Sequence, residues 1–178
     1  MNPLPLAVDL DGTLIKTDLF GLCMLAFLRR EPWRVLEFAT WFVRGRAPVK
    51  RRLKAYAPPV ESLPYDARVV DWLRAEKAAG RTIVLASASD SALVEAVAAH
   101  VGVFDAVFAS DGRVNLKSRK KAAALTAAFP DGFVYAGNEY ADLRVWDLAK
   151  AAVLVNASAA LTREARARFA IEREFPGE

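Results

Sequence analysis

Two carboxylates, Asp9 and Asp11, follow a short apolar run in the segment LAVDLDGTL. The run at residues 6–8 predicts a buried strand, and residues i and i+2 of an extended chain point to the same side. Buried carboxylates are costly unless they are paired or bind a metal. We therefore expect both side chains at one small site, although a simple turn is the alternative because Asp-Gly pairs often mark loops.

Two carboxylates at the carboxyl end of a strand suit several kinds of chemistry. In open α/β sheets this edge is where ligands bind. Carboxylate oxygens are preferred ligands of a hard cation such as Mg²⁺. One carboxylate can also act as a covalent nucleophile while the other transfers protons.

The rest of the chain predicts the elements that would hold this site. From residue 81 onward, β-branched apolar runs alternate with helical patterns, which indicates a parallel sheet covered by helices on both faces. The final charged segment, 161–174, is predicted to be a helix. The predicted strands cover residues 5–10, 81–87, 104–110, 132–138 and 151–158.

Residues 16–80 are predicted to form a helical cap. They contain several helical patterns between the first strand and the next, far more than one crossover needs. We expect a Rossmann-like α/β core made of residues 1–15 and 81–178, with the cap inserted after the first strand.

Further polar residues follow the later predicted strands. Ser87 follows the second strand, either as a ligand contact or as a helix N-cap, with Ser89 or Asp90 as the alternative cap. A lysine-rich segment, NLKSRKK, follows the third, and GNEYAD, with Asn138 and Asp142, follows the fourth. Because carboxyl ends of parallel strands share one edge, these groups are expected near the two aspartates.

The order of these segments resembles the haloacid dehalogenase (HAD) superfamily over residues 5–157: DLDGTL, then a strand-end serine, a lysine and GNxxxD. DLDGTL is the specific part of the match. The resemblance implies a Rossmann-like sheet and Mg²⁺-dependent hydrolysis of phosphate esters, with a cap of the phosphoserine-phosphatase type. More narrowly, VLASASD, SDGRVNLKSRKKAAAL and YAGNEYADLRVW resemble the HAD domain fused to UbiA-type prenyltransferases.

The resemblance also implies roles for single residues. Asp9 would be the nucleophile that becomes an aspartyl phosphate, and Asp11 the proton donor and then the base. Ser87 and Thr13 would contact the phosphate. Of the candidates Lys117, Lys120 and Lys121, the family pattern of a lysine followed four residues later by leucine fits Lys121, which would offset negative charge.

The predicted metal ligands depart from the family pattern at one position. The family usually has aspartate where this chain has Asn138. An amide oxygen still binds a hard cation but brings no charge, so weaker Mg²⁺ binding is expected. Asp142 could compensate as a direct ligand or through water. The expected ligand set is Asp9, Asp11, Asn138 and Asp142.

Composition limits the partners. The net charge of +4 suits a phosphorylated small molecule or an anionic membrane surface, and no nucleic-acid partner is expected. The N-terminus lacks the pattern of a signal peptide, and the run LFGLCMLAFL is too short to span a bilayer. A cytoplasmic protein is expected, with peripheral membrane contact as an option.

The cap carries large aromatic residues followed by a basic cluster. These aromatics either pack the cap's own core or form a surface for a prenyl-type lipid phosphate, a membrane or a membrane prenyltransferase. The aromatics are Trp33, Phe38, Trp41 and Phe42, and the bases are Arg44, Arg46, Lys50, Arg51, Arg52 and Lys54.

Two functions are therefore compatible with the sequence. The first is a Mg²⁺-dependent phosphatase that works through an aspartyl phosphate. The alternative is a weakly active or inactive HAD-like module that binds a membrane enzyme or a phosphorylated lipid. Hydrolysis of a generic phosphate ester would separate them.

Overall fold

A six-stranded sheet in the order β3-β2-β1-β4-β5-β6 forms the centre of the computed structural model. The structure describes residues 3–43, 49, 52–110 and 115–177, and all neighbouring strands are parallel. This confirms the predicted Rossmann-like α/β sheet. The strands are β1 (Leu6–Val8), β2 (Ile83–Asp90), β3 (Ala106–Ser110), β4 (Val134–Gly137), β5 (Ala151–Val155) and β6 (Ile171–Phe175).

The first strand lies in the middle of the sheet. Its three residues are fully buried, as expected for a strand of a parallel sheet covered on both faces. Leu6 is aligned with Ile83 on one side and with Val134 on the other. This register brings the carboxyl ends of β1, β2 and β4 to one edge.

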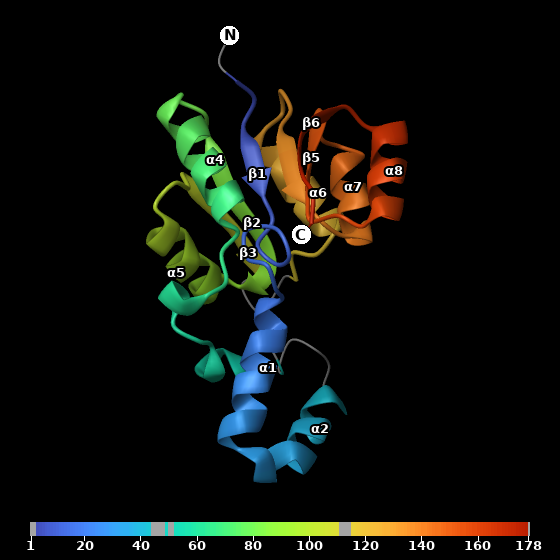
Figure 1. The fold of residues 1–178 in the computed structure, drawn as a ribbon. Helices are drawn as coiled ribbons and strands as arrows, with labels where there is room; N and C mark the ends of the chain where they lie inside the picture. Colours follow the sequence, from blue (N-terminus) through green and yellow to red (C-terminus); the bar gives the residue numbers. More distant parts are fainter. Residues whose placement is uncertain (1–2, 44–48, 50–51, 111–114, 178) are drawn as a thin grey trace.

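Helices cover both faces of the sheet, as Figure 1 shows. On one face, α4 (Ala67–Ala78) and α5 (Ser91–Val101) bury their apolar side chains against the sheet. The other face is covered by α6 (Arg119–Ala128), α7 (Leu143–Trp146) and α8 (Ala159–Arg168). Along each strand, successive side chains point alternately into the buried cluster on one face of the sheet and into the cluster on the other.

The helices after β1 project from the carboxyl edge of the sheet (Figure 1). They are α1 (Leu19–Arg30), η1 (Pro32–Arg34) and α2 (Val35–Val43), with the short turns η2 (Lys54–Tyr56) and η3 (Val60–Ser62) after them. Phe27 on α1 packs against Phe38, Trp41 and Tyr56, with ring centroids 5.0–5.3 Å apart. These aromatic contacts hold the cap together, and Phe27 and Trp41 belong to the same buried cluster as β1 and β2.

Helix α4 belongs to the range predicted as cap, 16–80, but it packs on the sheet. Val69 and Leu73 are fully buried in the core that contains β1 and β2. Asp66, the N-cap of α4, accepts a hydrogen bond from Asn156, which follows β5. The projecting part of the chain thus ends before α4.

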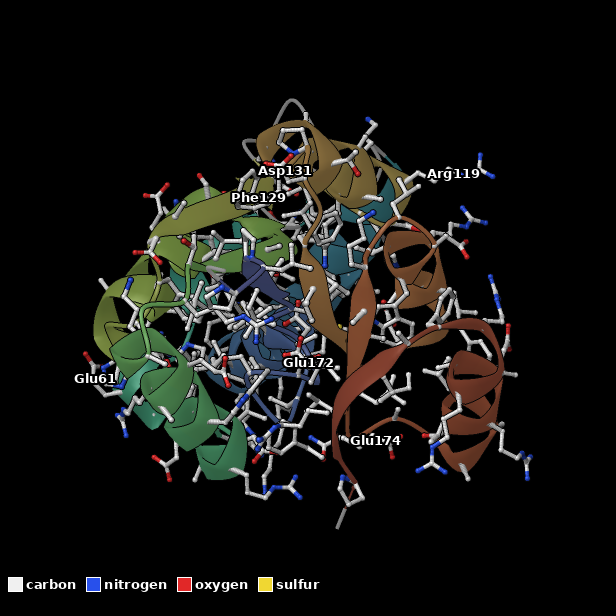
Figure 2. All side chains as sticks on the ribbon, turned by 90° about the horizontal axis from the view of Figure 1, so that it is seen from above. Glu61, Arg119, Phe129, Asp131, Glu172 and Glu174 are labelled. Carbon is white, nitrogen blue, oxygen red and sulfur yellow. The ribbon has the colours of Figure 1, made fainter. Side chains whose placement is uncertain are left out.

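The prediction of one charged helix over 161–174 is wrong. Helix α8 ends at Arg168, and Ile171–Phe175 form the edge strand β6, parallel to β5. Figure 2 shows Glu172 and Glu174 on this strand. Glu172 pairs with Arg81 at 2.6 Å and Glu174 with Arg166 at 2.6 Å. Charged side chains suit an edge strand, and because they suit a helix surface as well, the sequence pattern favoured a helix here.

Candidate active site

Asp9 and Asp11 lie where the chain leaves β1. The backbone N–H of Asp9 still donates to the carbonyl of Ala136 at 2.9 Å, so Asp9 keeps its alignment with β4. Gly12 then turns the chain with a φ of +75°, a conformation that glycine adopts without steric cost. Both carboxylates line one cavity.

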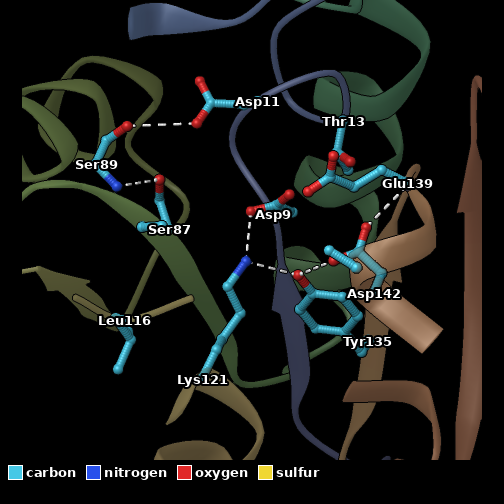
Figure 3. Close-up of polar contacts among 12 residues, drawn as sticks. Asp9, Asp11, Thr13, Ser87, Ser89, Leu116, Lys121, Tyr135, Glu139 and Asp142 are labelled. Atoms are coloured by element: carbon cyan, nitrogen blue, oxygen red, sulfur yellow. Dashed lines mark hydrogen bonds and ion pairs between the residues drawn. The ribbon is translucent and has the colours of Figure 1, made fainter. Parts of the chain in front are cut away.

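The carboxylate of Asp11 is held from two sides. Its Oδ1 accepts a hydrogen bond from the backbone N–H of Leu19, the first residue of α1, at 2.8 Å. Its Oδ2 accepts one from the hydroxyl of Ser89 at 3.3 Å (Figure 3). Asp11 is thereby attached to both the cap and the sheet.

Lys121 reaches Asp9 from the first turn of α6. Its ammonium donates to Asp9 Oδ1 at 2.7 Å, and the residue is 4% exposed. Lys117 and Lys120 are exposed, although Lys117 also lines the cavity. Of the three candidate lysines, Lys121 is the one that contacts the proposed nucleophile.

A hydrogen-bond chain runs from Lys121 through Tyr135 to Asp142. The ammonium also donates to the hydroxyl of Tyr135 at 2.8 Å, and this hydroxyl donates to Asp142 Oδ1 at 3.0 Å (Figure 3). Asp142 Oδ2 accepts from the backbone N–H groups of Asn138 and Glu139 at 2.9 and 3.0 Å. Asp142 therefore shapes the loop that carries Asn138.

Asn138 packs against the turn after Asp11. Its Oδ1 accepts a hydrogen bond from the hydroxyl of Thr13 at 3.3 Å. A Cβ at Gly12 would lie 2.0 Å from Asn138 Nδ2, so the close approach requires glycine. Asn138 and Asp142 both line the cavity beside the two aspartates.

Ser87 on β2 and Thr13, the two predicted phosphate contacts, are completely buried and are not among the residues that line this cavity. The Oγ of Ser87 accepts the backbone N–H of Ser89 at 3.0 Å. Asp90, not Ser89, is the N-cap of α5, because its side chain accepts from Ala92 N at 3.2 Å. The contact of Ser89 with Asp11 was not expected from the sequence, although Ser89 follows Ser87 at the two-residue spacing that places side chains on one face.

The cavity has a volume of about 570 Å³ and a strong excess of negative charge. Five carboxylates line it, against the ammonium groups of Lys117 and Lys121. The carboxylates belong to Asp9, Asp11, Asp18, Glu139 and Asp142. A phosphate dianion would be repelled by this lining, so the donor set fits a divalent cation bound through oxygen.

Metal binding would draw on more than carboxylates. Within the described part of the chain, no three His, Cys, Asp or Glu side chains are grouped as a metal cluster. The expected ligand set combines the carboxylates of Asp9, Asp11 and Asp142 with the amide oxygen of Asn138, and all four residues line the cavity.

Burial changes the acidity of the three central groups. It raises the pKa of Asp9 to about 7, against the opposing charge of Lys121. Burial likewise raises the pKa of Asp11. Burial alone would lower the pKa of Lys121, but the charges of Asp9 and Asp142 outweigh it, so the lysine remains cationic. The raised pKa of Asp11 suits a group that donates a proton.

The predicted aromatic residues of the cap divide into two groups. Phe38 and Trp41 pack within the cap, whereas Trp33 is 74% exposed. Arg52 lies over the Trp41 ring at 4.9 Å, and Lys54 pairs with Asp90 at 2.9 Å. Arg44, Arg46, Lys50, Arg51 and the side chain of Phe42 lie outside the described parts of the structure.

The fold and this constellation define a hydrolase with an aspartate site at the carboxyl edge of a parallel sheet. The family model for haloacid dehalogenase-like hydrolases matches residues 6–155. The chain belongs to the haloacid dehalogenase-like hydrolase family.

One curated relative is the uncharacterized protein y4nM of Sinorhizobium fredii, which is 40% identical over 154 residues. The match covers 85% of this chain but 30% of that protein, so this chain spans less than a third of its relative's length.

Solved structures share the fold at low identity. A protein of unknown function from Bordetella pertussis Tohama I has a TM-score of 0.70 at 17% identity, with 96% of this chain and 98% of that chain covered. Phosphoserine phosphatase in its apo form has a TM-score of 0.67 at 14% identity, with 98% and 94% covered. Its phospho-aspartyl intermediate analogue has a TM-score of 0.65 at 14% identity, with the same coverage.

No helix in the described part of the chain has the length and apolar character needed to cross a membrane.

Proposed function

We propose that this chain is a Mg²⁺-dependent phosphatase that hydrolyses a phosphate monoester through a phosphoryl group on Asp9. The buried contact between Lys121 and Asp9, 2.7 Å long, carries this proposal. It holds a carboxylate oxygen beside a fixed positive charge at the edge of a cavity, as a carboxylate nucleophile requires. The likeness to the phospho-aspartyl analogue of phosphoserine phosphatase supports the fold for such chemistry.

Each step has a candidate residue. Asp9 attacks phosphorus, and the bond to the leaving oxygen breaks while Asp11 gives that oxygen a proton. Asp11 then takes a proton from the water that attacks the aspartyl phosphate, which releases inorganic phosphate and restores Asp9. Lys121 offsets charge on the transferring group, with Ser87 and Thr13 as the further proposed phosphate contacts.

Bound Mg²⁺ would offset the repulsion between the Asp9 carboxylate and the phosphate dianion. Its proposed ligands are Asp9, the backbone carbonyl of Asp11 and the side-chain oxygen of Asn138. Asp142 is proposed to contribute its charge and a contact through water, because both its oxygens already accept hydrogen bonds from the protein.

The test is the hydrolysis of p-nitrophenyl phosphate by the purified chain, with Mg²⁺ and with excess chelator. We expect turnover that needs Mg²⁺ and returns when the chelator is titrated with the metal. A folded protein without turnover at any Mg²⁺ concentration would favour the other candidate, a non-catalytic module. The neutral Asn138 is the observation in favour of that candidate.

The proposed substrate class is a phosphorylated small molecule, with a prenyl-type lipid phosphate as the finer proposal. Exposed Trp33 and Leu36 at the end of the cap, 74% and 80% accessible, support contact with an amphiphile, a membrane surface or a prenyltransferase. Arg29 and Arg30 are exposed beside them, and two such signals bind anionic lipid better than one.

Co-sedimentation with anionic and neutral liposomes tests this finer proposal, together with the hydrolysis of prenyl phosphates and of sugar phosphates. Binding to anionic liposomes that Trp33→Ala/Leu36→Ala weakens would support it. Equal binding by the double variant, or a clear preference for sugar phosphates without liposome binding, would contradict this finer proposal. The cap would then only cover the site.

A further inference from the structure

Tyr135 is the one tyrosine of β4, and its hydroxyl lies between the proposed active-site lysine and Asp142. The residue is completely buried, and its ring packs against Trp146 with centroids 6.5 Å apart. A phenylalanine ring would fill the same space in the core. Packing therefore explains the ring of Tyr135 but not its hydroxyl group.

The hydroxyl connects two charged groups of the site. It accepts from the Lys121 ammonium at 2.8 Å and donates to Asp142 Oδ1 at 3.0 Å. Asp142 in turn holds the backbone of Asn138 and Glu139 through its other oxygen. The loop that carries a proposed metal ligand is therefore linked to the lysine through Tyr135.

The geometry fixes the direction of the ammonium. A lysine ammonium has three N–H donors, and two of them are used by Asp9 Oδ1 at 2.7 Å and by the Tyr135 hydroxyl at 2.8 Å. Because the three N–H bonds are arranged tetrahedrally, fixing two sets the direction of the third. Lys121 lines the cavity, so the third N–H remains for a phosphoryl oxygen.

We propose that Tyr135 is a positioning residue. Its hydroxyl orients the Lys121 ammonium towards the transferring phosphoryl group, and it links this orientation to the loop that carries Asn138 and Asp142. The proposal rests on the proposed phosphatase activity. Without the hydroxyl, Lys121 would keep its contact with Asp9 but would rotate about it, and preorganised charge would be lost.

The kinetic test compares Tyr135→Phe with Trp146→Phe. Trp146 donates to the backbone carbonyl of Tyr135 at 3.0 Å, so its variant disturbs the same core without removing the hydroxyl. For p-nitrophenyl phosphate we expect Tyr135→Phe to lower kcat at least about tenfold and to change KM less than about threefold. Trp146→Phe should keep kcat while it lowers the melting temperature. Unchanged kcat in Tyr135→Phe, or an equal loss in both variants, would overturn the proposal.

A second readout needs no turnover. The side-chain ammonium signal of Lys121 in ¹⁵N NMR, assigned by its absence in Lys121→Met, should show slow hydrogen exchange in the wild type and in Trp146→Phe. It should exchange faster in Tyr135→Phe. A nuclear Overhauser effect between this ammonium and the Tyr135 ring is expected in the wild type, and its absence would contradict the geometry directly. An inactive wild type that shows these signals would reject the phosphatase and the catalytic role of Tyr135, while the contact between Tyr135 and Lys121 would stand.

Discussion

The backbone N–H of Leu19 donates a hydrogen bond to Asp11 Oδ1 at 2.8 Å, which joins the first residue of the cap helix to the proposed acid and base. The contact holds the carboxylate at the N-terminus of α1, where partial positive charge favours an anion. Burial acts in the opposite direction and raises the pKa of Asp11. The hydrogen bond fixes the position of the carboxylate, and the raised pKa suits its proposed role of giving and taking a proton.

Asp11→Asn should keep this position but lose proton transfer. An amide oxygen can still accept from Leu19, so the fold and the cap should be preserved. We expect kcat to fall about 100- to 10,000-fold, the usual contribution of general acid–base catalysis. Steady-state kinetics and Mg²⁺ calorimetry check this. A variant with wild-type kcat, or one that no longer binds Mg²⁺, would contradict the assigned role.

Asn138→Asp should tighten Mg²⁺ binding, because it adds a full charge to a proposed oxygen ligand. The gain should be largest at low ionic strength, where charges are least screened. Calorimetric titration of both proteins at two salt concentrations measures it. Ala159→Asp at the exposed start of α8 adds the same charge outside the site and should leave the affinity unchanged. Equal or weaker binding by Asn138→Asp would mean that Asn138 is not a ligand.

Gly12→Ala should disrupt the site more than backbone strain alone explains. Gly12 and Gly80 have similar φ angles, +75° and +84°, and alanine is strained at both. A Cβ at Gly12 would lie 2.0 Å from Asn138 Nδ2, whereas nothing lies within 4 Å of one at Gly80. Both variants should lose about 1–2 kcal/mol of stability from strain, but only Gly12→Ala should weaken Mg²⁺ binding. Equal effects on Mg²⁺ affinity would show that the Gly12–Asn138 contact does not shape the site.

Asp66 should make the free energy of unfolding depend on pH below about 4. Hydrogen bonds from Arg68, with others from Asn156, lower the pKa of this buried carboxyl from 3.8 to about 2 in the folded chain. The unfolded chain then binds the proton more readily, so the stabilisation is complete above the unfolded pKa and is lost as the pH falls towards 2. The difference corresponds to about 2 kcal/mol.

Urea unfolding of the wild type and of Asp66→Asn between pH 7 and 2 isolates this group. The amide can still cap α4 but does not titrate, so the stability difference between the two proteins should shrink as the pH falls. A difference that stays constant would mean that the Asp66 carboxylate contributes nothing as a charge.

Local patterns predicted much of the site. The spacing of Asp9 and Asp11 after an apolar run placed them together, and the alternation of strands and helices gave the parallel sheet. The resemblance selected Lys121, whose ammonium does reach Asp9. The first two features follow from periodicity and from the common edge of parallel strands, whereas the choice of Lys121 rested on the resemblance.

Other features depend on contacts between distant segments. Ile171–Phe175 carry charges that suit a helix surface as well as an edge strand, and only pairing with β5 decides between them. Tyr135 lies in an apolar run that predicts a core strand, so its polar contacts with Lys121 and Asp142 were not foreseen. These contacts join residues that are far apart along the chain, so no regular spacing in the sequence reveals them.

The most direct test of the proposed phosphatase is turnover of p-nitrophenyl phosphate by Asp9→Asn in saturating Mg²⁺. The amide removes the nucleophile while keeping the size of the side chain, so the melting temperature should stay near that of the wild type. We expect kcat to fall at least about a thousandfold, as when a covalent nucleophile is removed. A folded Asp9→Asn protein with wild-type turnover would contradict the aspartyl phosphate and with it the central claim.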